Sequence, residues 1–273
     1  MDFLSLPIDE VELVFFDVET TGLSVNEGHA ICELGAVKIK GEEQVSVFST
    51  LINPKRSIPI SAGAVHHISD TDVKDAPYFE EIIDKFLYFL GEAVLGGYNI
   101  GFDLGFLNTE LSRINYPLIE MPSIDVLLMA RKFLSLRHYH LRALADYFNI
   151  SMPVSHRALQ DAIVTKEVFL KIKEEIKKRG IIQTKDFITL YGFDNNFFKK
   201  YEEPKIVLIQ ESIRAKLSLR ICYVSFTQKR KTYLVIPQKI IEKNEKKYML
   251  GVDLNTEKEL VFNLKHILSV EVL

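Results

Sequence analysis

Hydrophobic positions in the first two thirds of the chain alternate between strand-like runs and helix-like spacing. The run Val11–Val18 (VELVFFDV) is β-branched and aromatic, which predicts a strand buried on both faces. Two more strands are predicted at Ile31–Ile39 and Val45–Ile52, with a hairpin turn between them. The other expected elements are helices at Tyr78–Leu90, Leu104–Ile114, Leu141–Phe148 and Ala158–Lys178, and a short strand at Ala93–Tyr98. This order predicts an α/β domain whose mixed sheet is flanked by helices.

The pattern changes near residue 205, where helical spacing gives way to short β-rich runs separated by turns. The expected strands are Leu219–Phe226, Thr232–Ile236, Tyr248–Val252, Leu260–Phe262 and Ile267–Val272. Such spacing is typical of a small barrel or sandwich. We therefore expect one domain over residues 1–180, a linker with some helix over 181–204, and a small β-barrel domain over 205–273.

The formal net charge of −3 conceals an uneven distribution. Residues 1–180 hold 18 Lys and Arg against 26 Asp and Glu, a balance of −8, whereas residues 205–273 hold 13 against 7, a balance of +6. A basic domain favours polyanionic partners such as nucleic acid through counterion release. The simpler alternative is a solvated basic face on a small β domain.

Composition and targeting signals exclude several classes of protein. The chain has 273 residues, of which 47% are hydrophobic and 26% charged, and this excludes a disordered or collagen-like polymer. No apolar stretch approaches the roughly 20 residues of a membrane helix. Met1-Asp2-Phe3 carries an acid where a secretory signal would be basic, and Cys32 and Cys222 give neither zinc spacing nor a disulfide framework. The simplest expectation is a cytoplasmic protein with no membrane partner.

Candidate chemistry begins at the end of the first strand, where Asp17 and Glu19 share one face about 7 Å apart. Two carboxylates there are costly unless a cation binds them, although an Asp-x-Glu pair alone is common at strand ends. A third acid, Asp103, opens a predicted helix, where the helix dipole alone also favours a carboxylate. His156 precedes the longest helix and Asp161 lies in its first turns, so both can face the same space.

Together these segments resemble the three motifs of the DEDDh exonuclease superfamily. Phe16–Leu23 (FDVETTGL) resembles the first motif, Gly97–Asp103 the second, and His156–Asp161 the third. The similarity covers roughly residues 10–178 and is nearest to the proofreading, DNA polymerase III epsilon type. One departure is His67, which stands where relatives often have Gly. The resemblance implies a ribonuclease H-like fold.

The same resemblance implies 3′→5′ hydrolysis of phosphodiester bonds with two divalent metal ions. Asp17, Glu19, Asp103 and Asp161 would supply the hard oxygen ligands that suit Mg²⁺ or Mn²⁺. Two such ions, about 3.5–4 Å apart, would stabilise the attacking and leaving oxygens. Asp17 would bridge both ions, Glu19 and Asp161 would complete the first site, and Asp103 would serve the second. His156 would act as the general base that orients water and takes its proton, a role suited to imidazole.

The family further implies residues that hold the terminal nucleotide of the substrate. The turn that contains Thr20, Gly22 and Leu23 would hold this nucleotide, with Leu23 wedged against its base. His66 and Asn99 would line the same cleft. Each of these residues also has a purely structural interpretation, as part of a turn, a polar loop or a buried amide.

The basic C-terminal region, residues 213–273, resembles a WYL domain, a small Sm-like β barrel that often senses ligands or nucleic acid in bacterial regulators. The matching features are Tyr223, Tyr233 through Pro237, Tyr248-Met249-Leu250, Asp253 and Phe262 through Ile267. Asn263 and His266 stand where the WYL pattern favours arginine. The cations at 229–231 and 246–247 are available to guide a strand, with Tyr223, Phe226, Tyr233 or Tyr248 for stacking. The alternative is a packing or dimerisation barrel with an aromatic core.

The leading hypothesis is a metal-dependent 3′→5′ DNA exonuclease of the proofreading or repair type, acting on single-stranded DNA or a frayed 3′ end. The nearest alternative is the same chemistry on RNA or short oligonucleotides, because few contacts read the 2′-OH. Another is a nucleic-acid-sensing regulator in which the barrel is the working module. A polymerase partner is compatible with the resemblance, but no docking segment is evident, which favours a free-standing enzyme.

Overall fold

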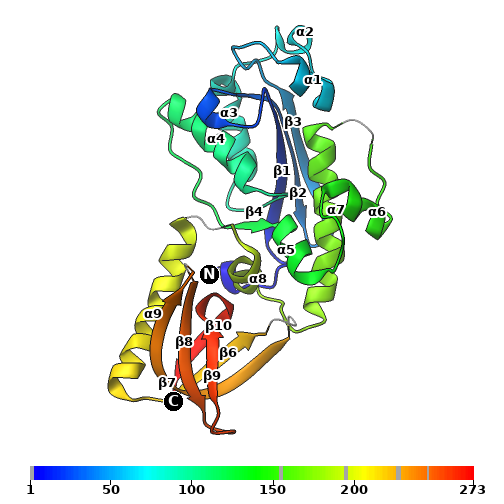
Figure 1. Cartoon of the computed structure of the whole chain (residues 1–273). Coiled ribbons are helices and arrows are strands. Elements are labelled where there is room, and N and C mark those ends of the chain that lie inside the picture. Colours follow the sequence, from blue (N-terminus) through cyan, green and yellow to red (C-terminus); the bar gives the residue numbers. More distant parts are fainter. Residues whose placement is uncertain (1–2, 154–155, 194–195, 226–228, 245) are drawn as a thin grey trace. The chain divides into compact units, whose positions relative to one another are not determined.

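The computed structural model describes residues 3–153, 156–193, 196–225, 229–244 and 246–273, apart from the side chains of residues 196–203. The chain folds into two compact units, Met1–Glu174 and Glu175–Leu273 (Figure 1).

A mixed sheet forms the centre of the first unit. Its strands are β1 (Glu12–Thr20), β2 (Ile31–Lys40), β3 (Glu43–Leu51), β4 (Val94–Gly97) and β5 (Ser123–Asp125). Their order in the sheet is β3-β2-β1-β4-β5. β1, β2 and β3 pair antiparallel, whereas β4 pairs parallel with both β1 and β5. The prediction of an α/β domain with a mixed sheet is therefore confirmed.

Helices cover both faces of this sheet, as Figure 1 shows. They are α1 (Ile60–His66), α2 (Asp70–Val73), α3 (Phe79–Leu90), α4 (Gly101–Arg113), α5 (Val126–Phe133), α6 (Leu141–Phe148) and α7 (Ala158–Lys177). Successive β1 side chains point to opposite faces. The ring centroids of Phe15 and Phe169 of α7 lie 5.0 Å apart, whereas those of Phe16 and Phe86 of α3 lie 6.2 Å apart. Asp17 and Glu19 continue the Phe15 side of the strand and therefore lie on the α7 face.

The second unit is an antiparallel sheet covered by a long helix. Its strands are β6 (Leu219–Val224), β7 (Arg230–Lys243), β8 (Lys246–Asp253), β9 (Glu259–Asn263) and β10 (Ile267–Val272), in the order β10-β6-β7-β8-β9. Helix α9 (Asn196–Ala215) packs on β7 and β10, and its Ile209 joins a core with Ile221, Val235 and Phe262. Among the described residues no pairing of β9 with β10 closes the sheet, so the predicted closed barrel is not confirmed.

The segment 181–204, which we predicted as a linker with some helix, is largely helical where it is described. It contains α8 (Thr184–Tyr191) and the start of α9, and it falls within the second unit. The reason is burial: Phe187, Ile188, Leu190 and Tyr191 are all buried, and such an apolar helix gains more from packing than from exposure in a linker.

β2 packs tightly against the start of α7 at Gly35, which is the register partner of Asp17 on β1. A Cβ atom at Gly35 would lie 2.1 Å from the backbone nitrogen of Leu159, near the start of α7. Because that neighbour is helix backbone, a larger residue would force the helix away from the sheet. The missing side chain therefore sets how near Asp161 of α7 comes to Asp17.

We expect Gly35→Ala to lower the free energy of unfolding by roughly 1–3 kcal/mol, because overpacking displaces α7. Denaturant unfolding measures this loss. The matched control is Gly105→Ala in α4, where a Cβ meets nothing within 4 Å, and there the change should be neutral or stabilising. Equal effects of the two substitutions would contradict the close-packing explanation.

Candidate active site

Three acids from two elements converge at the end of β1. Ligand oxygens of Asp17, Glu19 and Asp161 lie within 4.8 Å of one another, the first two on β1 and the third in the first turns of α7. Among the described residues, Asp161 Oδ1 is buried with no hydrogen-bond partner. A buried carboxylate oxygen without a donor is costly unless a cation is bound. We call these three residues the acid cluster.

Burial and mutual repulsion raise the pKa values of these acids. Desolvation is the main cause at Asp17, whose pKa lies well above its usual range, with the negative charges of Asp103 and Glu19 adding to the effect. Desolvation and the charge of Asp161 raise the pKa of Glu19 to about 8. Desolvation also raises the pKa of Asp161, although its hydrogen bond with His156 opposes the rise. The acid cluster is therefore an electrostatically unfavourable site that a bound cation would relieve.

Asp103 lies in the first turn of α4 and is buried beside the acid cluster. Its Oδ1 accepts a 3.0 Å hydrogen bond from the backbone N–H of Val18, the residue between Asp17 and Glu19. Desolvation raises the pKa of Asp103 to about 8, and this hydrogen bond acts in the opposite direction. Asp103 thus fixes the end of β1, and its charge acts directly on Asp17.

His156 reaches the acid cluster from the segment that precedes α7. Its Nδ1 lies 2.9 Å from Asp161 Oδ2, and 46% of its side chain is exposed. The ring is therefore held at the acid cluster and remains accessible to water. Four acids and one histidine, predicted from three distant stretches of sequence, are brought to one end of β1.

An ion pair that the motif analysis missed anchors the start of α7. Arg157 donates from Nε and Nη2 to the Glu33 carboxylate of β2, at 3.0 and 2.6 Å. The backbone N–H of Ala158 also donates to Glu33, at 3.0 Å. Glu33 is a lone acid in the apolar run ICELGAV. A charged residue in a buried strand needs a partner, and this was the signal in the sequence from which the ion pair could have been predicted.

Four of the five residues predicted to bind substrate line one pocket of about 320 Å³. Thr20, Gly22, Leu23 and His66 contribute, together with Glu19 and the apolar residues Val65 and Phe102, which we had not predicted. Leu23 is 86% exposed at this pocket. Thr20 Oγ1 donates to the Gly22 carbonyl at 2.7 Å, which holds the turn in shape. An exposed leucine in a largely apolar pocket is the type of surface on which a planar base packs.

The fifth predicted residue, Asn99, is exposed and does not line this pocket. It has a φ of 59° in the turn between β4 and α4, and its N–H donates to Asp125 at 3.1 Å. Asn is among the residues that tolerate such left-handed backbone. The departure at His67 has a related explanation: its φ is 58°, at the end of α1, a conformation that favours the Gly often found in relatives.

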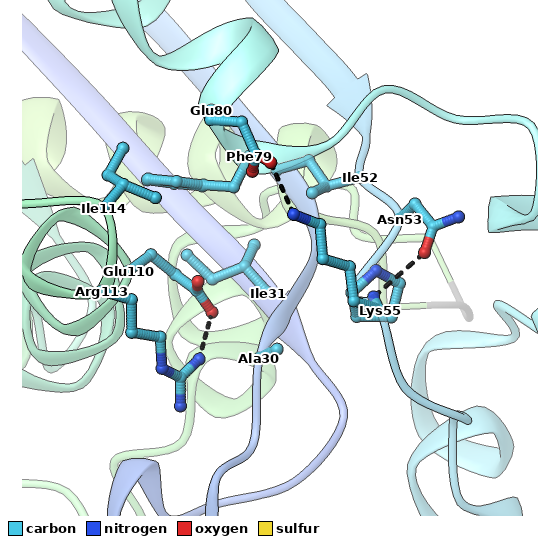
Figure 2. Close-up of a pocket in the computed structure, with 11 residues that line it drawn as sticks. Ala30, Ile31, Ile52, Asn53, Lys55, Phe79, Glu80, Glu110, Arg113 and Ile114 are labelled. Atoms are coloured by element: carbon cyan, nitrogen blue, oxygen red, sulfur yellow. Dashed lines mark hydrogen bonds and ion pairs between the residues drawn. The ribbon is translucent and has the colours of Figure 1, made fainter.

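A second pocket, of about 270 Å³, lies between the start of β2 and helices α3 and α4 (Figure 2). Lys55 Nζ lies 2.5 Å from Glu80, and Arg113 Nη1 lies 2.7 Å from Glu110. Both cations are thus paired with carboxylates of the same pocket, on an apolar floor that includes Phe79. Its charges are internally compensated, unlike those of the acid cluster.

The aromatic residues predicted for the C-terminal region pack against one another. Tyr223 and Tyr233 contact Phe262 with ring centroids 5.2 Å apart, edge to face. The Lys231 ammonium lies 4.6 Å from the centre of the Tyr233 ring. Tyr248 is half-buried, and Phe226 lies outside the described residues. The stacking role of these tyrosines stays a prediction.

In the part of the chain that the structure describes, every helix is too short or too polar to cross a membrane.

Two family models match the chain. The exonuclease model (RNase_T) matches residues 14–169, and the WYL domain model matches residues 204–272. The first match contains the acid cluster, Asp103 and His156.

Curated relatives extend this similarity in the first unit. The DNA polymerase III PolC-type protein of Caldanaerobacter subterraneus subsp. tengcongensis is 40% identical over 175 residues, which is 63% of this chain and 12% of that relative. A DNA polymerase III subunit epsilon-like protein of Rhodobacter capsulatus is 38% identical over 180 residues, 64% of this chain and 25% of the relative. The chain therefore spans a quarter or less of the length of these relatives.

Solved structures share the fold. The nuclease domain of 3′hExo, a DEDDh family member bound to rAMP, superposes with a TM-score of 0.55 over 61% of this chain and 93% of that chain, at 14% identity. Escherichia coli exonuclease I in complex with a dT13 oligonucleotide gives a TM-score of 0.57 over 90% of this chain and 55% of that chain, also at 14% identity.

We expect Mg²⁺ or Mn²⁺ to raise the melting temperature of the wild-type protein above its value in chelator, because a divalent ion neutralises the acid cluster. Thermal unfolding followed by circular dichroism measures the shift. In Asp17→Asn, which removes one charge from the cluster, the shift should be much smaller. Equal shifts in the two proteins would place the metal elsewhere.

In chelator, stability should depend on the charge of Glu19. Its pKa in the folded protein is about 8, well above the unfolded value of about 4.3, so folding binds a proton between these values. The loss of stability caused by ionising Glu19 in the folded protein is absent below about pH 4 and complete above about pH 8. Glu19→Gln should therefore gain melting temperature relative to wild type as the pH rises from 5 to 8. A melting-temperature difference between Glu19→Gln and wild type that stays constant with pH would contradict the raised pKa of Glu19.

Proposed function

Because the chain belongs to the exonuclease family, we propose that it hydrolyses DNA one nucleotide at a time from the 3′ end, as a two-metal enzyme of the DEDDh type. The observation that carries this proposal is the acid cluster: three carboxylates within 4.8 Å, with His156 in contact with Asp161. Water would attack the terminal phosphodiester, releasing a nucleoside 5′-monophosphate and leaving a new 3′-hydroxyl on the shortened strand.

The residues present fit a pair of hard divalent cations. The donors are carboxylate oxygens, one of them buried without a partner, and desolvation together with repulsion raises their pKa values. Asp17, Glu19 and Asp161 would hold one ion, and Asp17 and Asp103 the other. When bound, Mg²⁺ or Mn²⁺ would stabilise the negative charge that develops on the attacking and leaving oxygens.

The protein's own groups would position the water and the 3′ end. His156, held at the acid cluster but exposed to water, would accept the proton of the attacking water. The 320 Å³ pocket would take the terminal nucleotide, with Leu23 and Val65 against the base and Thr20 and His66 near its polar groups. Asn99 lies outside that pocket, and its predicted contact with substrate rests on the family resemblance alone.

The relatives support DNA rather than RNA as the substrate, since those with 38–40% identity are named for DNA polymerase III. The partner we propose is single-stranded DNA or a frayed 3′ end, and the same names make a DNA polymerase a second candidate partner. RNA digestion is the alternative outcome of the experiment below.

We expect the full chain with Mg²⁺ to shorten a 5′-labelled single-stranded DNA in a ladder and to digest matched RNA more slowly. Gel electrophoresis of the labelled strands, with Mg²⁺, Mn²⁺ or chelator, measures both. Asp17→Ala should abolish digestion because it removes the bridging ligand, and His156→Ala should slow it by about 10²–10⁴-fold.

The matched control is Asp75→Ala, which removes an acid whose side chain is 88% exposed and should digest like wild type. Circular dichroism establishes that each variant is folded. An Asp17→Ala protein that digests the 3′ end as fast as wild type would refute the metal assignment. If the wild type digests RNA faster than DNA, RNA is the substrate instead of DNA.

A further inference from the structure

Glu33 and Arg157 connect β2 to the start of α7 across 124 positions of sequence. We propose that they are positioning residues for the exonuclease reaction: the ion pair seats the start of α7 so that His156 lies correctly over the acid cluster. This inference rests on the proposed function and assigns these two residues a part in it.

The geometry of the pair is that of a forked anchor on a buried carboxylate, although 44% of the Arg157 side chain is exposed. Glu33 is only 2% exposed and accepts from Arg157 Nε, Arg157 Nη2 and the backbone N–H of Ala158. A guanidinium fork on a carboxylate fixes both distance and direction, which a single ammonium contact does not. The third bond holds the helix backbone itself, so the first residue of α7 is tied directly to β2.

The anchor lies between the groups that it would position. His156 immediately precedes Arg157, and Asp161 follows four residues later, one helical turn along α7. On the sheet side, Glu33 is the register partner of Glu19, and two residues further along β2 Gly35 is the partner of Asp17. Any shift of the start of α7 would therefore change the placement of His156 relative to the two β1 acids.

The charge of the pair matters as much as its shape. Glu33 is a further carboxylate beside the acid cluster, and its negative charge contributes to the raised pKa values of Asp17, Glu19 and Asp161. Arg157 compensates that charge and opposes the rise at Glu19. The pair thus anchors the helix without adding net charge to the metal site.

The experiment is a double-mutant cycle between Arg157→Gln and His156→Ala, with kcat and KM measured on single-stranded DNA in Mg²⁺ well below the melting temperature of every variant. The double substitution Glu33→Gln/Arg157→Gln removes the ion pair without leaving a buried charge. The control is Lys38→Gln, which breaks the 3.1 Å Lys38–Glu12 ion pair further along β2. Arg157→Lys, which keeps the charge and loses the fork, replaces Arg157→Gln if that variant does not fold.

Arg157→Gln should lower kcat by up to about 100-fold with KM unchanged, because a displaced base loses alignment rather than substrate binding. In the His156→Ala background the same substitution should cost less than about twofold more. Lys38→Gln should leave kcat unchanged. The proposal would be overturned if Arg157→Gln lowered kcat by the same factor in the wild-type and His156→Ala backgrounds. An unchanged kcat in Arg157→Gln would overturn it as well.

A readout without turnover separates this inference from the proposed function. In ¹H–¹³C NMR spectra of the histidine rings, with the His156 signal identified by its loss in His156→Ala, Arg157→Gln should shift that signal and Lys38→Gln should not. If wild type fails to digest DNA, the exonuclease function fails and the ring signal still decides whether Arg157 positions His156. An unmoved His156 signal would overturn the positioning role even in an active enzyme.

Discussion

Burial of like-charged carboxylates at the end of β1 is the constraint on which the rest of the first unit depends. Ligand oxygens of Asp17, Glu19 and Asp161 are held within 4.8 Å of one another, where desolvation is the main cause of the raised pKa values and mutual repulsion adds to it. A chain free to relax would separate such groups. The sheet and α7 prevent this separation, so part of the folding free energy is used to maintain a site that is unfavourable until a cation binds.

β2 is the element that makes this arrangement possible. At Gly35 the absence of a side chain allows the backbone of α7 to approach the strand, and at Glu33 an ion pair with Arg157 locks the helix there. The acids of β1 are fixed from the other side, since Asp103 of α4 accepts from the backbone of Val18. Thus β1 carries two of the acids, while β2 and the helices α7 and α4 set the geometry of the acid cluster.

Local sequence patterns predicted the α/β layer, and Asp17 and Glu19 at the end of a buried strand are a visible conflict between charge and burial. The full set of four acids and His156 was predicted from the resemblance of three segments to the DEDDh exonuclease motifs. The Glu33–Arg157 pair was missed because its partners lie 124 residues apart and no local period connects them. The sequence predicted a small barrel or sandwich and some helix within residues 181–204, but whether the second sheet closes and how α8 is buried depend on tertiary packing. Asn99 lies outside the 320 Å³ pocket, with its backbone N–H donating to Asp125 from a left-handed turn, and its contact with substrate stays a prediction.

The measurement that tests the central claim most directly is a calorimetric titration of Mn²⁺ into the wild-type chain and into Asp17→Asn. The wild type is expected to bind two ions per chain, with protons released as the acids with raised pKa values ionise. The variant lacks one of the carboxylates that would hold the ions, and it should lose most of this binding heat. Identical titrations for the two proteins, or no binding to wild type at millimolar Mn²⁺, would contradict the assignment of these carboxylates as a metal site.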